Sequence, residues 1–469
     1  MTDFKPGAVR AFRFLDATFD AATGEARLGY AFDDGPEMVE VLRFPGAPFA
    51  PDAARADAVQ RALRLLHGLA GVSYYKAAVP PEIRFEAYDI DAATAALLTS
   101  VYENGLGEFA YRNGISLRGK IRFPVGDSRL KPLLQEATPV GAPSGANLSA
   151  GSLPVPTTRA LVAIGGGKDS LVSIEALRAA GVEQTVAWVG GSPLIAACAA
   201  RTGLPTLNIG RTLSPELFEL NRRGALNGHI PVTAVNSAIL ALAALLTGHD
   251  QVVFSNERSA SYGSLIPGTG EVNHQWSKGW DFERDFAAHL RSHVAPGLHY
   301  YSLLRPFSEL AVARQFARID HYDAHFSSCN RNFHLLGERP AQRWCGVCPK
   351  CHFVFLALAP FMPKPRLVGI FGRNLLDEPE QAPGFDALME FRDHKPFECV
   401  GEGRESRAAM ELLSQSPAWR EDALVRRYLR EIRPQLDESE RGLASLLEPS
   451  DDHGIPGGLW ERVRAHFGA

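Results

Sequence analysis

Apolar and polar residues alternate with different periods in the first and second parts of the chain. In the first 125 residues, three runs with strand character are separated by turn residues, which predicts a meander of three antiparallel strands. These strands are expected at 11–19, 26–32 and 37–44, a fourth at 82–88, and helices at 53–70 and 91–111. This part is therefore predicted to be an α+β domain.

From residue 159 onward, short apolar runs alternate with patterns of helical period. Strands are expected at 160–164, 185–189, 206–209 and 251–254, and helices at 169–180, 193–201 and 233–246. Such alternation predicts a doubly wound parallel sheet with helices on both faces. In sheets of this kind, ligands bind beyond the carboxyl ends of the strands. The fold class is thus predicted to be α/β.

Composition changes divide the chain further. Residues 126–158 are rich in Pro, Gly, Ser and Ala and are predicted to be a linker between the α+β domain and a catalytic domain at 159–400. Residues 401–469 are rich in Arg, Glu and Leu and are expected to form a helical extension with helices at 422–432 and 438–447.

The overall composition is that of a globular protein, with 45% hydrophobic and 22% charged residues over a length of 469. The formal net charge is −4 and no Lys/Arg-rich run is present, which argues against a nucleic-acid partner. The first residues lack a signal-peptide pattern and no apolar run is long enough to span a bilayer, so a cytoplasmic location without membrane contact is expected. None of these features predicts an oligomeric state.

A glycine-rich turn joins the expected strand at 160–164 to the helix that follows. It contains Gly165, Gly166, Gly167, Lys168, Asp169 and Ser170. Glycines allow close backbone approach, and the free N–H groups at a helix start favour an anion, so the turn is a candidate phosphate cradle. A Walker A loop would place Ser or Thr directly after the Lys, so this is a different kind of loop. The alternative is a turn without a chemical role.

The loop resembles the SGGxDS loop of the N-type ATP pyrophosphatases, or PP-loop enzymes, with Gly165 in place of the leading Ser. The resemblance implies that ATP is cleaved between its α- and β-phosphates while AMP is transferred to a substrate oxygen.

A second motif contains four cysteines, Cys329, Cys345, Cys348 and Cys351. Their spacing predicts a structural Zn²⁺ site with a closed thiolate shell. An iron–sulfur cluster and four unrelated thiols are the alternatives. The arrangement resembles the zinc site of 7-cyano-7-deazaguanine synthase. The remaining cysteines, Cys198 and Cys399, are interpreted as ordinary unpaired thiols.

The polar segment at 254–283 follows an expected strand and offers acids, cations and an imidazole. Its candidate site residues are Asn256, Glu257, Arg258, Asn273, His274 and Lys278.

In combination, the N-terminal Gly105–Gly114 stretch, the glycine loop, residues 255–261, residues 272–278 and the cysteine cluster resemble the UDP-N-acetylmuramoyl-L-alanyl-L-glutamate epimerase (MurL) family. The resemblance implies inversion of the terminal L-Glu of UDP-MurNAc-L-Ala-L-Glu to D-Glu, using ATP and Mg²⁺, in peptidoglycan precursor synthesis. The substrate is then a nucleotide-sugar dipeptide, activated as an acyl-adenylate with release of pyrophosphate and later AMP.

Roles follow from that chemistry as hypotheses. The glycine loop from Gly165 to Ser170 is expected to bind ATP and pyrophosphate, and Asp169 and Glu257 are expected to hold Mg²⁺. The catalytic candidates are Lys168, Asp169, Glu257, His274 and Lys278, of which His274 and Lys278 are the proposed acid/base or oxyanion groups. The substrate-binding candidates are Asn256, Arg258 and Asn273, with Arg258 gripping a carboxylate.

Two other functions are consistent with these motifs. One is a different PP-loop adenylating enzyme that makes an amide, nitrile or thio product. The other is a non-catalytic, zinc-stabilised nucleotide-binding protein.

Overall fold

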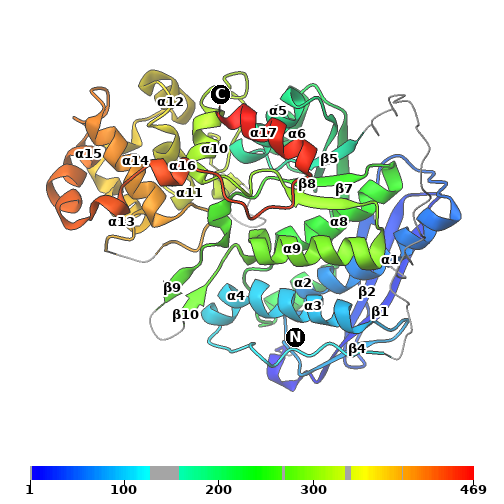
Figure 1. The fold of residues 1–469 in the computed structure, drawn as a ribbon. Coiled ribbons are helices and arrows are strands. Elements are labelled where there is room, and N and C mark those ends of the chain that lie inside the picture. The colour runs from blue at the N-terminus through cyan, green and yellow to red at the C-terminus, as the bar shows by residue number, and fades with distance from the viewer. Residues whose placement is uncertain (1–2, 127–157, 267–269, 333–339, 393–394, 469) are drawn as a thin grey trace, which may run out of the picture.

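We analysed a computed structural model of the chain, which describes residues 3–126, 158–266, 270–332, 340–392 and 395–468. Within these residues, nine strands form one sheet (Figure 1). Their order across the sheet is β11 (His299–Ser302), β8 (Gln251–Phe254), β5 (Arg159–Ala163), β6 (Glu183–Val189), β7 (Thr206–Thr212), β3 (Met38–Arg43), β2 (Glu25–Phe32), β1 (Ala11–Asp20) and β4 (Glu82–Phe85).

The strands from β11 to β7 are parallel to one another, as the alternating pattern predicts. The meander of β1, β2 and β3 is antiparallel, and β3 joins β7 in antiparallel register, with Leu42 opposite Arg211. The expected α+β part and the expected parallel part therefore share one continuous sheet. The predicted domain boundaries stay a prediction, and the expected linker falls almost wholly outside the described residues.

A buried ion pair joins the two parts of this sheet. The Arg211 guanidinium on β7 donates to the Glu40 carboxylate on β3 at 2.7 and 3.3 Å, and Glu40 is completely buried. The Arg211 guanidinium also donates to the Ser73 hydroxyl at 3.3 Å.

Replacing Glu40 with Gln is expected to lower the free energy of unfolding by about 3–5 kcal/mol, because it leaves the Arg211 charge buried without a counter-charge. Denaturant unfolding measures the loss. The matched control is Glu25→Gln, which breaks partly exposed pairs with Arg27 and Arg43 and is expected to cost less than about 1 kcal/mol. Equal losses in the two variants would contradict the assigned role of the buried pair.

Helices cover both faces of the sheet. They are α1 (Ala53–Ala70), α2 (Val72–Tyr75), α3 (Ala92–Gly105), α4 (Gly107–Arg112), α5 (Lys168–Ala179), α6 (Pro193–Arg201), α7 (Pro215–Arg222), α8 (Val232–Thr247), α9 (Trp280–His289) and α10 (Glu309–Phe316). Leu161 of β5 packs in the core with α1 and α8, whereas Ala160 and Val162 pack in the core with α5 and α10. Successive strand residues point to opposite faces, and both faces are covered, which is why β5 is apolar from Ala160 to Ala163.

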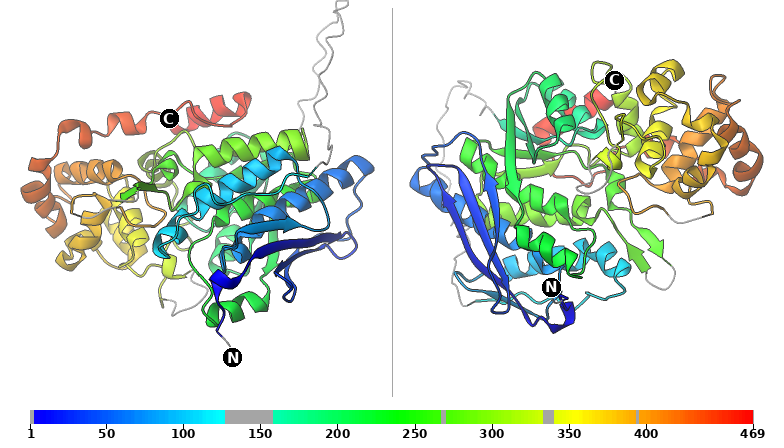
Figure 2. Two further views of the ribbon diagram at one scale, coloured as in Figure 1. Left: turned by 90° about the horizontal axis from the view of Figure 1, so that it is seen from below. Right: turned by 180° about the vertical axis from the view of Figure 1, so that it is seen from behind.

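The second half of the chain adds a group of helices beside one edge of the sheet (Figure 2). These are α11 (Pro349–Leu358), α12 (Lys364–Phe371), α13 (Ala382–Leu388), α14 (Gly403–Gln415), α15 (Ala423–Arg427) and α16 (Ala444–Leu447), and α17 (Gly457–Gly468) returns to pack on α5. A short hairpin of β9 (Ser264–Ile266) and β10 (Gly270–Val272) projects from the molecule (Figure 1).

Two helix predictions were wrong in detail. The expected helix at 438–447 is broken into a 3₁₀ turn, Glu438–Glu440, and α16, with Gly442 between them. The expected helix at 91–111 ends at Gly105 and resumes at Gly107. A Cβ on Gly105 would lie 2.6 Å from the Pro231 ring, so the glycine permits the close contact between α3 and the start of α8.

Across the described residues, none of the helices combines the length and the apolar character needed to cross a lipid bilayer.

Candidate functional site

The glycine loop lies where the sequence places it, between the end of β5 and the start of α5. Gly166 has φ of +80°, a conformation that a side chain would strain. At Gly167, an added Cβ would lie 2.5 Å from the Ser328 hydroxyl, so this glycine permits the close approach of the segment 327–329. Gly165 has open space where a side chain would be, and the missing family Ser therefore leaves room beside the loop.

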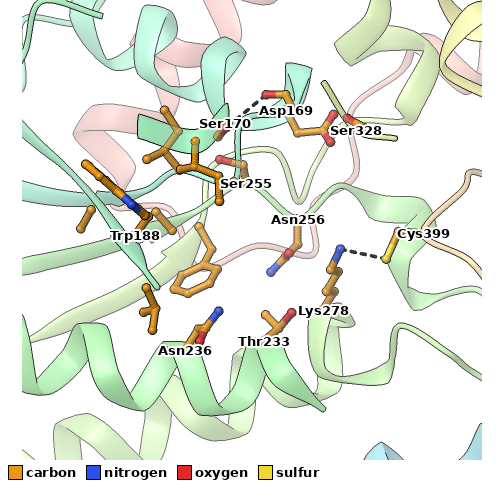
Figure 3. Close-up of a pocket in the computed structure, with 18 of the residues that line it drawn as sticks. Asp169, Ser170, Trp188, Thr233, Asn236, Ser255, Asn256, Lys278, Ser328 and Cys399 are labelled. Atoms are coloured by element: carbon orange, nitrogen blue, oxygen red, sulfur yellow. Dashed lines mark hydrogen bonds between the residues drawn. The ribbon is translucent and has the colours of Figure 1, made fainter. Parts of the chain in front are cut away.

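A cavity of about 330 Å³ opens at this loop (Figure 3). Helix α5 begins at its wall, and its N-cap residue, Gly167, offers no side chain to satisfy the first N–H groups. These free donors and the helix dipole favour an anion at that wall. Residues from several elements line the cavity: Ala163, Ile164, Gly165, Gly167, Asp169, Ser170, Trp188, Ile195, Thr233, Asn236, Leu240, Phe254, Ser255, Asn256, Lys278, Ser327, Ser328, Asn330, Lys350 and Cys399.

The Lys168 side chain is 1% exposed and lies beneath the loop, outside the cavity lining. Its ammonium pairs with the carboxylates of Asp169 and of Glu309 on α10. Burial would lower the pKa of Lys168, but the two carboxylates outweigh burial and raise it. The predicted contact between Lys168 and phosphate stays a prediction, and the cations that line the cavity are Lys278 and Lys350.

Two interacting carboxyl groups, Asp169 in the cavity lining and the buried Glu257 outside it, have opposite pKa shifts. Burial would raise the pKa of Asp169, but the ammoniums of Lys168, Lys350 and Lys278 lower it. Burial raises the pKa of Glu257, which is 5% exposed, and the negative charge of Asp169 raises it further. The two groups therefore repel each other when both are ionised, and a divalent cation near both would relieve that repulsion.

The segment after β8 contributes Ser255 and Asn256 to the cavity, and Lys278 reaches it from a 3₁₀ turn before α9. The Asn256 amide donates to the Ser302 hydroxyl at 3.0 Å, which couples the carboxyl ends of β8 and β11. The polar segment after β8 and the glycine loop thus contribute to the same cavity.

Cys399 is unpaired, as the sequence interpretation expects, but its surroundings are not those of an ordinary thiol. The Lys278 ammonium donates to its Sγ at 3.1 Å, and both groups line the cavity (Figure 3). Burial would raise the pKa of the Cys399 thiol, but Lys278, His274 and Lys350 outweigh it and lower the pKa well below its usual range. Spacing alone contains no signal for this residue, because it lies more than a hundred residues from Lys278 along the chain.

His274 is not among the residues that line the cavity, but it interacts with Cys399. Its Nδ1 pairs with the Glu108 carboxylate of α4, and its ring contacts that of His229 at 4.1 Å between centroids. Burial would lower the pKa of His274, but its hydrogen bonds with Cys399 and Glu108 raise the pKa to about 9. The N-terminal part of the chain thus contributes Glu108 to the site.

Two substrate-binding candidates lie apart from this cavity. Arg258 and Asn273 line a separate hollow of about 280 Å³, beside Trp276 and Trp280. The Arg258 guanidinium donates to the carbonyls of Leu446 and Glu448 at 3.1 and 3.0 Å, so it anchors the C-terminal segment. The roles predicted for both residues stay predictions.

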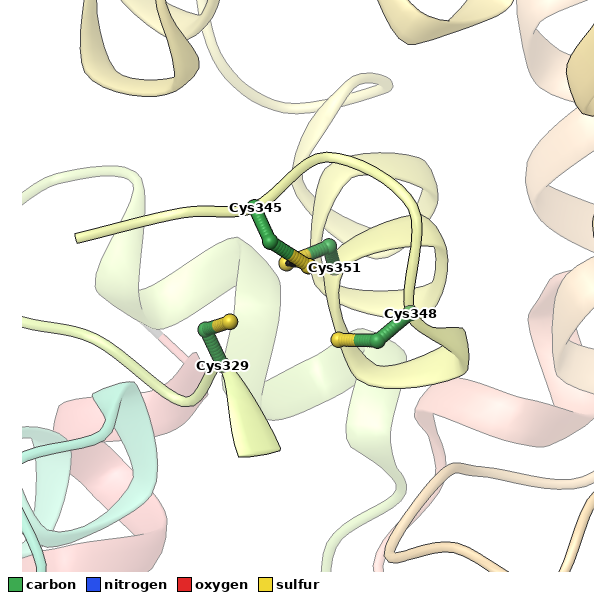
Figure 4. Close-up of side chains that lie close together, drawn as sticks. All are labelled: Cys329, Cys345, Cys348 and Cys351. Atoms are coloured by element: carbon green, nitrogen blue, oxygen red, sulfur yellow. Dashed lines mark hydrogen bonds between the residues drawn. The ribbon is translucent and has the colours of Figure 1, made fainter. Parts of the chain in front are cut away.

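The four cysteines of the predicted metal site lie together (Figure 4). Their Sγ atoms are all within 4.8 Å of one another, and the Cys345 and Cys351 sulfurs are 3.7 Å apart. A tetrahedral zinc–thiolate site places its sulfurs roughly 3.8 Å apart, so the thiols fit a zinc ion. Such an ion would stabilise the loop and the start of α11, with all four positions filled by protein.

The cysteine cluster also positions a residue of the cavity. Lys350 lies between Cys348 and Cys351 at the start of α11, and its ammonium donates to the Cys399 carbonyl. Ser327 and Ser328 precede Cys329 directly. Sequence analysis missed these three cavity residues, although their proximity to the cysteines was a usable signal.

This geometry defines a class: an α/β protein with a polar, cation-lined cavity at the carboxyl ends of parallel strands, which is where enzymes of this architecture bind small molecules. Comparison with known proteins narrows the class. Residues 3–303 match the MurL N-terminal domain and residues 325–442 match the MurL C-terminal domain. The chain belongs to the MurL family.

Relatives extend over nearly the whole chain. A protein of Xanthomonas oryzae pv. oryzae (strain MAFF 311018) is 67% identical over 467 residues, covering 100% of both chains. A protein of Micromonospora sp. (strain ATCC 39149 / NRRL 15099 / SCC 1413) is 44% identical, over 95% of this chain and 96% of its own. A protein of Salinispora tropica is also 44% identical, over 88% of this chain and 87% of its own. All three are named UDP-N-acetyl-alpha-D-muramoyl-L-alanyl-L-glutamate epimerase.

Proposed function

We propose that this protein is an ATP-dependent epimerase that converts the terminal L-Glu of UDP-MurNAc-L-Ala-L-Glu to D-Glu through an acyl-adenylate, in peptidoglycan precursor synthesis. The substrate follows the name shared by its relatives. The activation step rests on one observation: the uncapped start of α5, Asp169, Lys278 and Lys350 line a single cavity.

The cavity has the chemistry that a nucleoside triphosphate requires. Part of the lining is apolar, formed by Ile164, Trp188, Ile195, Leu240 and Phe254, and Asn236 adds an amide to the lining. Apolar walls with a few polar groups suit a nucleobase. The same lining carries the backbone of the glycine loop, serine hydroxyls and two ammoniums, which suit phosphates.

A divalent cation such as Mg²⁺ would neutralise phosphate charge there. Asp169 and Glu257 would hold it, because the repulsion between their carboxylates is what a cation relieves. Lys278 and Lys350 would attract the triphosphate and orient its leaving pyrophosphate against the loop.

Activation explains why an epimerase would use ATP. The α-hydrogen of glutamate is very weakly acidic next to an ionised carboxylate, because removing it places a second negative charge beside the first. When the carboxylate oxygen displaces pyrophosphate from ATP, the resulting mixed anhydride has no such charge. Its carbonyl can then accept the electron pair of the broken C–H bond, and Lys278 would stabilise the developing oxyanion.

Reprotonation on the opposite face then inverts the α-carbon, and water releases AMP and the D-product. Groups that transfer these protons need pKa values near the working pH and must reach both faces of the α-carbon.

The test is incubation with UDP-MurNAc-L-Ala-L-Glu, ATP and Mg²⁺ in D₂O. The expected products are AMP, pyrophosphate and a D-Glu epimer that carries deuterium at its α-carbon, measured by NMR and chiral analysis after hydrolysis. Formation of ADP and phosphate would contradict the activation step. AMP formation with a stable amide, nitrile or thio product would instead indicate another adenylating enzyme, and no turnover of ATP at all would indicate a nucleotide-binding protein.

A further inference from the structure

A thiol that the activation step does not use lies in the wall of the cavity. Cys399 is partly exposed there, and its Sγ accepts a hydrogen bond from Lys278 at 3.1 Å. Thiolates are the reactive form of cysteine, and a neighbouring ammonium stabilises the thiolate. Structural thiols usually pack among apolar groups, whereas this one contacts a cation in a ligand-sized cavity.

The charged groups around Cys399 come from three separate parts of the chain. Lys278 precedes α9, and His274, whose pKa the thiol raises, is held by Glu108 of α4. Lys350 of α11 donates to the Cys399 carbonyl, and the neighbouring Glu398 accepts from the Asn330 amide. Two ammoniums and an imidazole with a raised pKa thus lie near Cys399, and the carboxyl groups of Glu108 and Glu398 lie near them.

We propose that the Cys399 thiolate is a catalytic residue that transfers a proton at the glutamate α-carbon, on one of its two faces. This inference rests on the proposed function. In one direction of the reaction, the Cα–H bond of the acyl-adenylate breaks, its proton goes to Sγ, and the electron pair moves onto the carbonyl oxygen as an enolate. In the other direction, the Cys399 thiol returns a proton to the α-carbon and becomes a thiolate again.

Lys278 and His274 are positioning residues in this proposal. They hold the thiol in its ionised form in the resting site, which the low pKa of Cys399 also indicates. Lys278 lines the same cavity, so an anionic ligand bound there would also interact with the Lys278 ammonium. The ammonium would then stabilise the thiolate less, and the thiolate would be a stronger base when the substrate is present. A group on the opposite wall must serve the other face.

The first experiment replaces Cys399 with Ser, which preserves size, and with Ala. ATP–pyrophosphate exchange supported by UDP-MurNAc-L-Ala-L-Glu is expected to persist within a few-fold of wild type, while epimerisation falls roughly 10²- to 10⁴-fold. In D₂O, each variant is expected to exchange the α-hydrogen of only one epimer, L or D, without inverting it. That asymmetry arises because the group on the opposite face still works, and a merely structural role would reduce both exchanges alike.

Near-wild-type epimerisation by Cys399→Ala would overturn the proposal. Equal loss of both α-hydrogen exchanges together with the pyrophosphate exchange would also overturn it, since Cys399 would then be structural. Failure of the proposed function is distinguishable, because the wild-type protein itself would then show no substrate-dependent pyrophosphate exchange.

A second experiment tests the thiolate directly and needs no turnover. Peptide mass spectrometry measures the alkylation of Cys399 by iodoacetamide as a function of pH. An ordinary thiol has a pKa of about 8.5, and in the wild-type protein we expect alkylation to proceed well below that pH. Lys278→Met is expected to shift the alkylation profile to higher pH. Lys278→Arg is expected to keep the profile close to that of the wild-type protein. An unchanged profile in Lys278→Met would contradict the proposal.

Discussion

Replacing Asp169 with Asn is expected to lower ATP-dependent epimerisation by at least about 100-fold, with the fold intact. The substitution removes a carboxylate from the wall of the cavity while it preserves side-chain size. If Asp169 and Glu257 hold the cation that neutralises the triphosphate, the variant loses much of the charge stabilisation of the transition state for pyrophosphate release. Loss of one such electrostatic interaction typically lowers the rate roughly 10²- to 10³-fold. Initial rates of AMP formation at saturating substrate measure it.

The matched control is Glu183→Gln on β6. Glu183 forms an exposed pair with Arg159 at 3.0 Å, far along the strand from the cavity, so its loss is expected to leave turnover unchanged. Thermal unfolding of both variants checks that the fold survives; in Asp169→Asn, Lys168 still pairs with Glu309. Undiminished AMP formation by Asp169→Asn would show that the nucleotide is activated elsewhere.

Replacing Cys348 with Ser is expected to have the largest effect on stability. The thiol is 7% exposed, and the expected zinc ion would lose one of four protein ligands. Because metal binding contributes directly to folding, we expect a loss of at least about 4 kcal/mol in the free energy of unfolding, or failure to fold. Activity should fall as well, since the cluster places Lys350 in the cavity.

Elemental analysis distinguishes the outcomes. One zinc per wild-type chain and none in Cys348→Ser is expected, whereas Cys198→Ala, which changes a buried thiol outside the cluster, should retain the metal. Iron with acid-labile sulfide would indicate an iron–sulfur cluster instead. A full complement of zinc in Cys348→Ser would contradict the assigned ligand set.

Much of the secondary structure could be predicted because its signals are local. Helix α1 begins after Asp52, whose side chain accepts from the Arg55 N–H, and it spans the predicted residues. The glycine loop is recognisable for the same reason, since a strand, a turn and a helix start are consecutive in the chain. Where the local signal was weak, as at Gly442, the prediction of a continuous helix was wrong.

The sequence by itself determined the short-range elements of this protein: the strands and helices of the sheet, the glycine turn and the spacing of the four cysteines. Their signals are periodicity, helix caps and neighbouring ligands, which act over a few residues. Only the tertiary structure decided that β3 joins β7 in one sheet, that Lys168 lies beneath the loop, and that Cys399 meets Lys278. These outcomes depend on burial and on charges brought together from distant segments, and no local pattern along the chain encodes them.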